Sequence, residues 1–585
     1  MSTQTLPPVS QLEKLERLAR WAGGHGASLH ANVWVGVEEG KGKGAGLFVG
    51  EKRDCCGGRD RAAHERGEGE GEGRVEGEAV KMEDIANCPP GITLSFLNAV
   101  DAGGEFGMHE PAGGGEGEKA AVPSLPGRLS REAPPHVVGR FFLMRQVLLG
   151  EGSFWGAYID ALPPAPAPRW RKGRSEGEEC WALPPFWMED ERQCLQGTNV
   201  GSACEKIREQ TRGDWEDAIR VLKGYDGDID WEGVYTRELY EWAYCVFSSR
   251  SFRPRLVIPE RILGEALEKV NEVFNGGEEG MGNGRGKVKA EDFGVLLPLV
   301  DLANHHPMAK VRWDLEEGKG VVLRVRGGIG VEGGERKEVF NWYGDKTNAE
   351  LLLSYGFMTP YIRGKQEDDD ERRHNAYVHV RKARKKGVAL HGNGEEEKAK
   401  DFLISLEPMT DEEGMSDRSR GSVLVKRDAV KVNGFEHFDQ SMVWDILVNG
   451  ICEGDLGTVK GVWGVKEDGA HDEREGAGGD SEVDIKLLTK VLGTYPFPNE
   501  DAQQIVALVL NVLVQKVRSE KSNLENAGKK TEMEVEEGPR DLRPERGETG
   551  RLKLIADYRR EVRWVLEAAE RSILAAVVAQ HGIGS

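Results

Sequence analysis

The sequence predicts an α+β fold, in which short antiparallel strands and amphipathic helices are both present. A short strand at residues 33–37 is followed, at residues 41–49, by a glycine-rich turn into a second strand. Apolar residues recur at helical spacing from Tyr235 to Val246 and again from Leu554 to Ala576. Side chains repeat every two residues in a strand and every 3.6 in a helix, so these patterns predict both kinds of element.

The chain begins with a predicted helix, and we expect residues 1–29 to form an N-terminal helical segment. Ser10 and Glu13 match a capping box. One apolar face is formed by Leu12, Leu15, Leu18 and Trp21. We see no basic-then-apolar targeting pattern here and no apolar run of about eighteen residues, so we expect no membrane partner.

A glycine-rich turn follows the first strand. Its residues are Lys43, Gly44, Ala45 and Gly46. Glycine lets a backbone approach another group closely, which suits a ligand-binding loop. A simple hairpin is an alternative interpretation. A dinucleotide-binding loop is disfavoured, because a glycine- and glutamate-rich segment follows where that fold needs a helix.

Arg250 lies at the end of the helical pattern that includes Tyr235, Leu239, Trp242 and Val246. The four apolar residues are spaced by four, three and four positions and predict one buried face. Arg250 is either a binding residue or a solvated arginine near the negative end of the helix dipole.

Polar residues follow an apolar strand predicted from Leu296 to Val300. Asp301, Asn304 and His305 come directly after it. A rigid strand with an open end is a common place for a functional site. The alternatives are a strand-end cap for Asp301 and an Asx-type turn for Asn304 and His305.

Two tyrosines surround a short predicted helix. Thr347 and Glu350 match a capping box, and Gly356 is placed as the residue that ends the helix. Tyr355 is therefore held at a fixed helix end, which suits a phenol that must be aimed at a substrate. Tyr343, Trp342 and Phe357 add aromatic rings nearby, although a buried core cluster explains them equally well.

Taken together, the Asn304-His305 pair and the later Glu-Leu-x-x-x-Tyr-Gly-Phe motif at 350–357 resemble the C-terminal half of a SET domain. The chain is most similar to the Rubisco large-subunit methyltransferase-like group. This resemblance implies a SET β-fold split by a helical insert and followed by a mostly α-helical domain. The implied parts are residues 30–110 and 291–365 for the SET domain, 135–290 for the insert and 385–585 for a helical substrate-binding domain.

The resemblance also implies S-adenosylmethionine as cofactor and a protein lysine as methyl acceptor. It assigns catalysis to Tyr355 and Tyr343. Cofactor binding falls to Lys43, Gly44, Ala45, Gly46, Arg250, Asn304, His305 and Tyr355. Substrate binding falls to Asp301, Arg250, Trp342 and Phe357. The family often has Glu at the position of Lys43 and Ser or Cys at the position of His306.

The charge and cysteine content of the chain indicate which classes of binding partner are expected. The formal net charge of −21 disfavours a nucleic-acid surface, which needs a basic stripe, and is compatible with a basic protein substrate such as a ribosomal protein. The eight cysteines include no Cys-x-x-Cys pair, so we expect free thiols and no metal site. Glycine- and charge-rich stretches such as 65–78 are interpreted as surface insertions. We expect a monomer in the nucleus or cytoplasm.

Two other functions remain open at this point. A SET-fold protein could have lost catalysis and act as a protein-binding module, although the Tyr355 and Asn304-His305 motifs are intact. One branch of the similar proteins methylates histidine, and the sequence does not separate histidine from lysine as the acceptor.

Overall fold

The computed structural model describes most of the chain and divides it into two compact units. The described residues are 10–37, 44–50, 82–109, 122–166, 181–275, 286–326, 336–359, 375–381, 401–409, 434–464, 487–488, 497–537 and 548–581. The first unit comprises Met1–Ala182 and Arg208–Tyr343, and the second comprises Leu183–Ile207 and Gly344–Ser585. The domain boundaries expected from the sequence stay a prediction.

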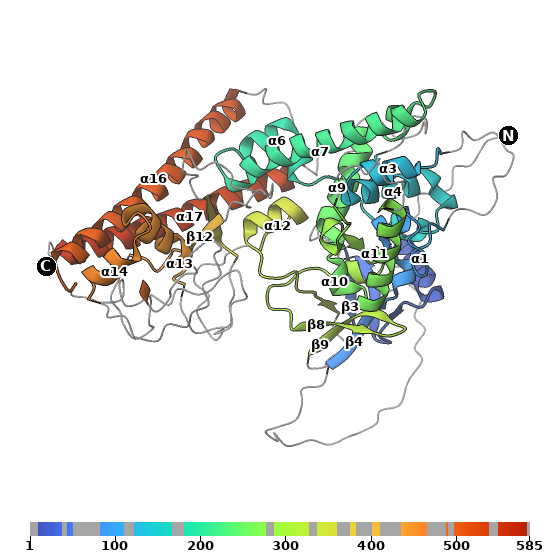
Figure 1. Cartoon of the computed structure of the whole chain (residues 1–585), viewed down its shortest axis with the longest axis horizontal. Helices are drawn as coiled ribbons and strands as arrows, with labels where there is room; N and C mark the ends of the chain where they lie inside the picture. Colours follow the sequence, from blue (N-terminus) through green and yellow to red (C-terminus); the bar gives the residue numbers. More distant parts are fainter. Residues whose placement is uncertain are drawn as a thin grey trace, which may run out of the picture. The chain divides into compact units, whose positions relative to one another are not determined.

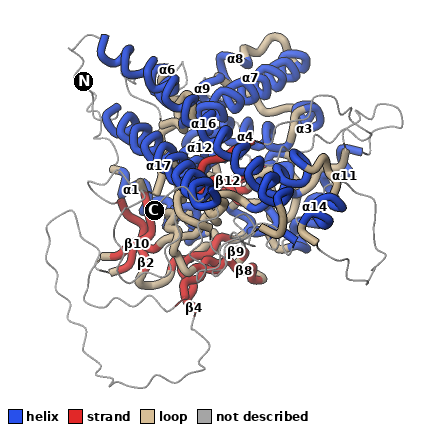
Figure 2. Tube along the Cα trace, turned by 90° about the vertical axis from the view of Figure 1, so that its left-hand side faces the viewer, coloured by secondary structure: helices blue, strands red, loops and turns tan. Residues whose placement is uncertain are grey.

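Three small antiparallel sheets form the β part of the first unit. Their strands are β1 (Ser28–Leu29), β2 (Val33–Val37), β3 (Ala45–Val49), β4 (Met82–Cys88), β5 (Leu94–Ser95), β6 (Ser251–Phe252), β7 (Val295–Leu296), β8 (Val311–Glu316), β9 (Gly320–Arg326) and β10 (Lys337–Val339). The strand orders are β1-β4-β9-β8, β10-β3-β2 and β5-β7-β6. Figure 2 shows β4, β8 and β9 lying together. Each sheet therefore joins strands that are far apart in the sequence.

Helices pack around these sheets in the first unit. They are α1 (Gln11–Gly24), α2 (Phe96–Ala99), α3 (Gly127–Glu132), α4 (Pro135–Leu149), α5 (Gly156–Ala161), α8 (Trp231–Val234), α9 (Arg237–Arg250), α10 (Pro254–Val257) and α11 (Glu260–Asn275). Short 3-10 turns are η1 (Pro90–Ile92), η2 (Gly150–Gly152), η4 (Ala290–Asp292) and η5 (Val300–Leu302). The core is continuous from α1 through α4 and α9 to β7 and β9.

The second unit is mostly helical. Its elements are η3 (Pro184–Phe186), α6 (Glu189–Cys194), α12 (Asn348–Tyr355), β11 (Tyr377–Arg381), β12 (Asp401–Ser405), α13 (Gln440–Trp444), η7 (Asp445–Ile451), α14 (Leu456–Val462), α16 (Glu500–Glu537) and α17 (Glu548–His581). The helix α7 (Asn199–Tyr225) contributes residues to both units. Figure 1 shows α16 and α17 side by side, and Arg518 bonds Glu570 while Arg559 bonds the Leu524 carbonyl. The two helices are thus antiparallel.

These elements confirm the predicted α+β class and most of the predicted caps. Ser10 and Glu13 form the capping box of α1, and Thr347 and Glu350 form that of α12. The apolar residues of α17 that were predicted to share a face, from Tyr558 to Ala576, are buried. On the opposite side Glu567 pairs with Arg571 at 4.0 Å.

Two element lengths differ from the prediction. The strand expected from Leu296 to Val300 ends at Leu296, because Pro298 cannot donate to a ladder and Leu299 turns the chain at φ 74°. From the sequence, Asn499 after Pro498 predicts the start of a helix that runs to about Arg518, but α16 continues to Glu537. Polar residues after Arg518 hid this extension, because a helix partly exposed to water needs no apolar stripe.

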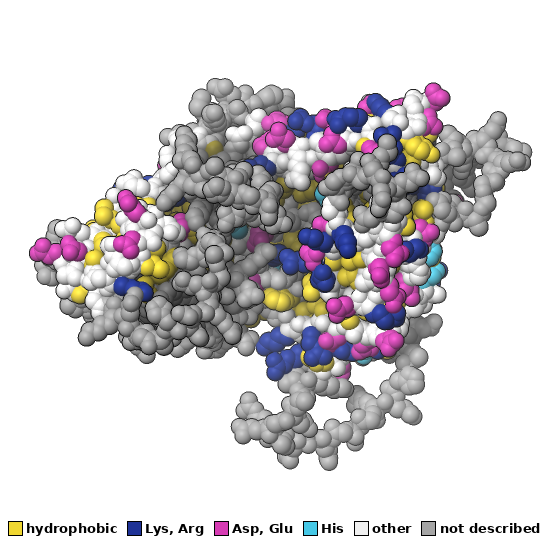
Figure 3. Space-filling view, viewed as in Figure 1, with side chains coloured by type: hydrophobic (Ala, Val, Ile, Leu, Met, Phe, Trp, Pro, Cys, Tyr) yellow, Lys and Arg dark blue, Asp and Glu magenta, His cyan; other side chains and the backbone are white. Residues whose placement is uncertain are grey.

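The visible surface mixes charges of both signs. In Figure 3, Lys and Arg side chains lie among Asp and Glu side chains over the described parts of the chain. Examples are Arg255 with Glu291 at 2.7 Å and Arg261 with Glu265 at 2.9 Å, all well exposed. Such exposed pairs contribute little to stability. Within the described residues, each helix is either too short or too polar to span a bilayer.

Candidate active site

A buried ion pair between Arg250 and Asp301 is the centre of the candidate site. Arg250 is the last residue of α9, and the chain continues directly into β6. β6 pairs with β7, and Asp301 follows β7 by five residues in η5. Arg250 Nη1 thereby donates to Asp301 Oδ2 at 3.3 Å and to the Asp301 carbonyl at 3.1 Å. The Asp301 side chain is 1% exposed and that of Arg250 is 19% exposed, so the arginine side chain is the more exposed of the two.

Tyr158 completes this cluster from α5. Its hydroxyl donates to Asp301 Oδ2 at 2.7 Å, across 143 residues of sequence. Burial raises the pKa of the Tyr158 phenol well above its ordinary value, and the nearby Asp301 charge adds to this shift. Burial also raises the pKa of Asp301, while Arg250 and the Tyr158 hydrogen bond act in the opposite direction.

The Asp301 side chain faces Arg250 and Tyr158, and among the described residues it forms no hydrogen bond that caps the end of β7. Its expected role beside the substrate stays a prediction. The sequence analysis missed Tyr158, because no local pattern connects a residue in α5 with a carboxylate in η5.

Asn304 contacts both the glycine-rich turn and the neighbouring strand β10. Its Nδ2 donates to the Ala45 carbonyl at 3.1 Å and to Glu338 Oε1 at 2.6 Å. A Cβ atom added to Gly46 would lie 3.0 Å from Glu338 Oε1 and 3.2 Å from Asn304 Nδ2. Gly46 is therefore required by its own protein neighbours, which the sequence could not reveal because Glu338 had not been singled out.

Gly44 has different surroundings. A Cβ atom added there meets no atom within 4 Å, so packing within the described residues does not demand a glycine at this position. Open space beside a glycine backbone suits a close-approaching ligand. Lys43, the neighbouring residue in the predicted set, lies outside the described residues.

His305 and Tyr343 form a second part of the site. His305 bridges Asn341 in parallel, and Tyr343 N donates to His305 Nδ1 at 3.1 Å. The two rings stack with centroids 5.1 Å apart. The Tyr343 hydroxyl donates to the Ala303 carbonyl at 3.0 Å. The Tyr343 side chain therefore packs against the Asn304-His305 segment.

Asn341 is buried and links the Asn304–His306 segment to Trp313 and Trp342 by hydrogen bonds. Its backbone N–H donates to the Asn304 carbonyl at 2.7 Å, and its carbonyl accepts from His306 N at 2.9 Å. Its side-chain oxygen accepts from Trp313 Nε1 at 3.1 Å and from Trp342 N at 2.8 Å. Asn341 is 1% exposed, so it fixes where Trp342 and Tyr343 begin. Asn341 was not among the residues predicted for the site.

Tyr355 and Phe357 belong to the second unit. Tyr355 ends α12, Gly356 adopts the left-handed conformation at φ 78°, and the rings of Tyr355 and Phe357 meet edge to face at 6.2 Å. Both side chains are half-buried. The expected helix end is confirmed, whereas the joint action of Tyr355 with the residues of the first unit stays a prediction.

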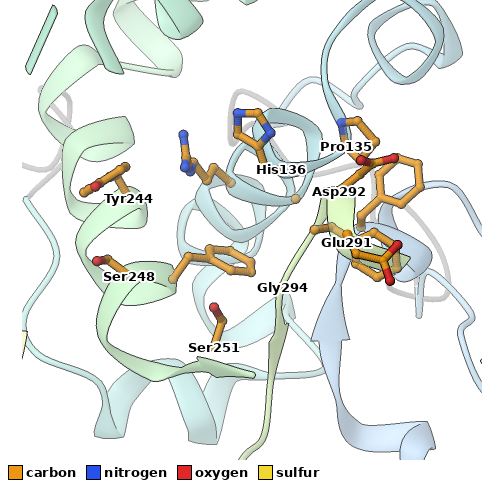
Figure 4. A pocket seen from close by; sticks show the side chains of 13 residues that line it. Pro135, His136, Tyr244, Ser248, Ser251, Glu291, Asp292 and Gly294 are labelled. Atoms are coloured by element: carbon orange, nitrogen blue, oxygen red, sulfur yellow. The ribbon is translucent and has the colours of Figure 1, made fainter. Parts of the chain in front are cut away.

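A separate cavity of about 370 Å³ lies on another face of α9. Figure 4 shows Tyr244, Ser248 and Ser251 along one side of it and His136 with Pro135 on α4 across from them. Arg250 follows Ser248 by two positions, which is about 200° around a helix, so it faces away from this cavity. The charged groups that line the cavity already have partners. Arg140 pairs with Asp214 at 3.2 Å, Glu291 with Arg255, and Asp292 caps Lys289 N.

Metal ligation has no support in the described part of the chain, where no group of three or more His, Cys, Asp or Glu side chains is arranged to hold an ion. The cysteines that the structure describes are free and buried. The residues that gather at the site are instead a guanidinium, backbone amides and aromatic rings. This set fits an organic cofactor with a carboxylate and a flat base.

Sequence comparison identifies relatives of one kind. No protein-family model matches the chain. The human N-lysine methyltransferase SETD6 is 28% identical over 303 residues, covering 50% of this chain and 55% of that protein. The ribosomal lysine N-methyltransferase set10 of Schizosaccharomyces pombe is 26% identical over 228 residues, covering 39% of this chain and 32% of that protein. The chain thus spans about a third to about half the length of these curated relatives.

Among solved structures, the SET domain of LSMT bound to lysine and AdoHcy superposes with a TM-score of 0.48 and 13% sequence identity, over 97% of this chain and 92% of that one. Rubisco LSMT bound to AdoMet gives a TM-score of 0.46 and 14% identity, over 98% of this chain and 94% of that one. By sequence, the chain is a homologue of the SET-domain protein-lysine methyltransferases.

Proposed function

We propose that this protein transfers a methyl group from S-adenosylmethionine to the ε-amine of a lysine in a protein substrate. The observation that carries the proposal is the arrangement around Arg250 and Asn304. The first unit contains a partly exposed Arg250 side chain, a glycine turn that is open at Gly44 among the described residues, and a stacked His305–Tyr343 pair. Strand pairing with β7 and the contacts of Asn304 and Asn341 connect these segments. The names of the sequence relatives, which are lysine methyltransferases, support the same chemistry.

The donor set matches the parts of this cofactor. Arg250 would hold its carboxylate, because a guanidinium offers several N–H donors beyond the one given to Asp301. The backbone of Gly44, Ala45 and Gly46, with that of Asn304 and His305, would hold the remainder. When bound, S-adenosylmethionine supplies an electrophilic methyl group on its sulfonium.

The protein itself must then deliver a neutral amine. A free lysine has a pKa of about 10.4, so at neutral pH its ammonium has to lose a proton before attack. Aromatic walls from Trp342, Tyr343 and Phe357 would exclude water, which favours the uncharged amine. The Tyr355 hydroxyl would orient the nitrogen lone pair toward the methyl group, in line with the bond that breaks.

The substrate is proposed to be a ribosomal or other basic protein. The net charge of −21 favours association with a basic chain, and one relative is named for ribosomal lysine methylation. We further propose that the protein acts as a monomer, without nucleic acid, in the nucleus or cytoplasm.

Transfer of a radiolabelled methyl group tests the proposal. Wild-type protein incubated with labelled S-adenosylmethionine and a ribosomal protein fraction should label a distinct band, and hydrolysis should release methyl-lysine. Tyr355→Phe should lower labelling by at least about 100-fold, since the orienting hydroxyl is lost. Release of methyl-histidine would replace lysine by histidine as acceptor. Absence of labelling with every protein fraction, despite cofactor binding, would favour a binding module.

A further inference from the structure

Three elements that are distant in the sequence meet around one carboxylate oxygen. Asp301 Oδ2 accepts from the Tyr158 hydroxyl at 2.7 Å and from Arg250 Nη1 at 3.3 Å. Tyr158 is 1% exposed and the Asp301 side chain is equally buried. Only Arg250 of the three keeps part of its side chain in contact with solvent.

This geometry restricts how the guanidinium can point. Arginine has several rotatable bonds, and a fixed carboxylate with a carbonyl beside it holds one end of the fork in place. Asp301 supplies both acceptors, its Oδ2 and its own backbone carbonyl. The carboxylate could still rotate about its own side-chain bonds, and the hydrogen bond from Tyr158 opposes that rotation.

We propose that Tyr158 is a positioning residue, which fixes Asp301 and through it aims Arg250 at the carboxylate of the cofactor. The inference rests on the proposed function, because it assumes that Arg250 meets S-adenosylmethionine. Tyr158 itself touches neither the cofactor nor the reacting atoms.

The phenol suits this role because it stays neutral. Burial and the neighbouring Asp301 charge raise the pKa of Tyr158, so its proton remains available for donation at neutral pH. A neutral hydrogen-bond donor restricts the orientation of the Asp301 carboxylate without neutralising its negative charge. That charge remains paired with Arg250. A cationic residue in place of Tyr158 would share that charge and weaken the hold on the arginine.

Tyr158→Phe tests the proposal, because it removes the hydroxyl and keeps the ring. Tyr235→Phe is the matched control. Tyr235 is also fully buried in the first unit, and its hydroxyl donates to the Pro123 carbonyl at 2.8 Å, away from Arg250. Tyr158→Phe loses a buried hydrogen bond and Tyr235→Phe loses a partly buried one. A purely structural role therefore predicts a loss of thermal stability in both variants and no difference in cofactor affinity.

Titration calorimetry should show the dissociation constant for S-adenosylmethionine raised by about tenfold in Tyr158→Phe, which corresponds to 1.4 kcal/mol, and unchanged in Tyr235→Phe. In turnover assays the KM for the cofactor should rise while the KM for the protein substrate stays constant. The loss should disappear in an Asp301→Asn background, because the two residues act through one contact.

Equal affinities of Tyr158→Phe and wild type would overturn the inference and leave the proposed function intact. A full effect of Tyr158→Phe in the Asp301→Asn background would overturn it as well. Failure of the folded wild type to bind the cofactor is a separate result, which would remove the proposed function and this inference together.

Discussion

Two glycines separated by one residue have opposite surroundings in the cofactor turn. Gly46 is crowded by Glu338 and Asn304, whereas Gly44 faces open space. A requirement for glycine at Gly46 is therefore explained by packing. A requirement at Gly44 would have to come from a bound ligand, so the pair separates stability from binding.

Gly46→Ala is expected to destabilise the first unit by about 1–3 kcal/mol, because the new Cβ displaces neighbours at 3.0 and 3.2 Å. Gly44→Ala should change the free energy of unfolding by less than about 0.5 kcal/mol. Urea unfolding measures both values. A destabilisation of the same size in the two variants would contradict the described packing.

Gly44→Ala is also expected to weaken S-adenosylmethionine binding although the protein remains stable. A methyl group on this backbone would occupy the space into which the cofactor must come. Calorimetric titration at equal protein stability measures the effect. Unaltered affinity would place the cofactor away from Gly44.

Single residues also show what the sequence could not specify. Asn304, His305 and Arg250 were found because their motifs are local and ordered. Asp301 was found, but its contacts with Tyr158 and Arg250 depend on the pairing of β6 with β7. The sequence does not indicate that Leu299 adopts φ 74°, a conformation that is rare for a residue with a side chain. This turn directly precedes the 3-10 turn that holds Asp301.

At the scale of elements, α12 is defined by its two ends. Its capping box and its glycine were both predicted, because each depends on residues within one turn. Gly356→Ala should destabilise the second unit by about 1–2 kcal/mol, since a Cβ is unfavourable in the left-handed conformation at φ 78°.

Gly461→Ala provides the control for that substitution. Gly461 lies within α14 of the same unit, is not in the left-handed region, and has nothing within 4 Å of an added Cβ. Alanine should there be neutral or stabilising by up to about 1 kcal/mol. Thermal unfolding of the two variants gives the comparison, and equal effects would contradict the cap geometry.

The α16–α17 pair depends on Glu570, which accepts from Arg518 at 2.8 Å and Lys521 at 3.2 Å. The Arg518 hydrogen bond lowers the pKa of Glu570 below its ordinary value of 4.5. The charged form is thus favoured in the folded state. The added stability is present above pH 4.5 and is lost as the pH falls below it toward the folded pKa.

Glu570→Gln should therefore lower stability by about 1 kcal/mol at pH 7, and the difference from wild type should shrink as the pH falls below the ordinary glutamate pKa of 4.5. Glu567→Gln is the control, because Glu567 has one distant partner, Arg571 at 4.0 Å. Its effect should be at most about 0.5 kcal/mol. A loss for Glu570→Gln that stays constant down to pH 3 would rule out the ion pairs as its cause.

Longer elements were harder to predict than caps. The polar second half of α16 lacks a helical stripe, and its length is visible only in the folded chain. By contrast, α17 was predicted because one face of it is apolar at helical spacing, and the residues of that face from Tyr558 to Ala576 are buried. Periodicity reports burial, and it fails where a helix is solvated.

At the scale of the whole molecule, the predicted site residues are divided between the two units. Arg250 and Asn304, which are predicted to bind the cofactor, and Tyr343, which is predicted to be catalytic, belong to the first unit. Tyr355 belongs to the second unit. The order of the motifs along the chain was sufficient to predict the family. The packing of distant partners such as Glu338 and Tyr158 required the folded structure, because it depends on sheet register.

Binding of S-adenosylmethionine to the complete protein tests the central claim most directly. Isothermal titration should give saturable binding of one molecule per chain with a dissociation constant of about 100 µM or tighter, equivalent to at least about 5.5 kcal/mol. Asn304→Ala, which removes the hydrogen bonds to the Ala45 carbonyl and to Glu338, should abolish it while the protein remains folded. No heat of binding from folded wild-type protein, or equal binding by Asn304→Ala, would contradict the account.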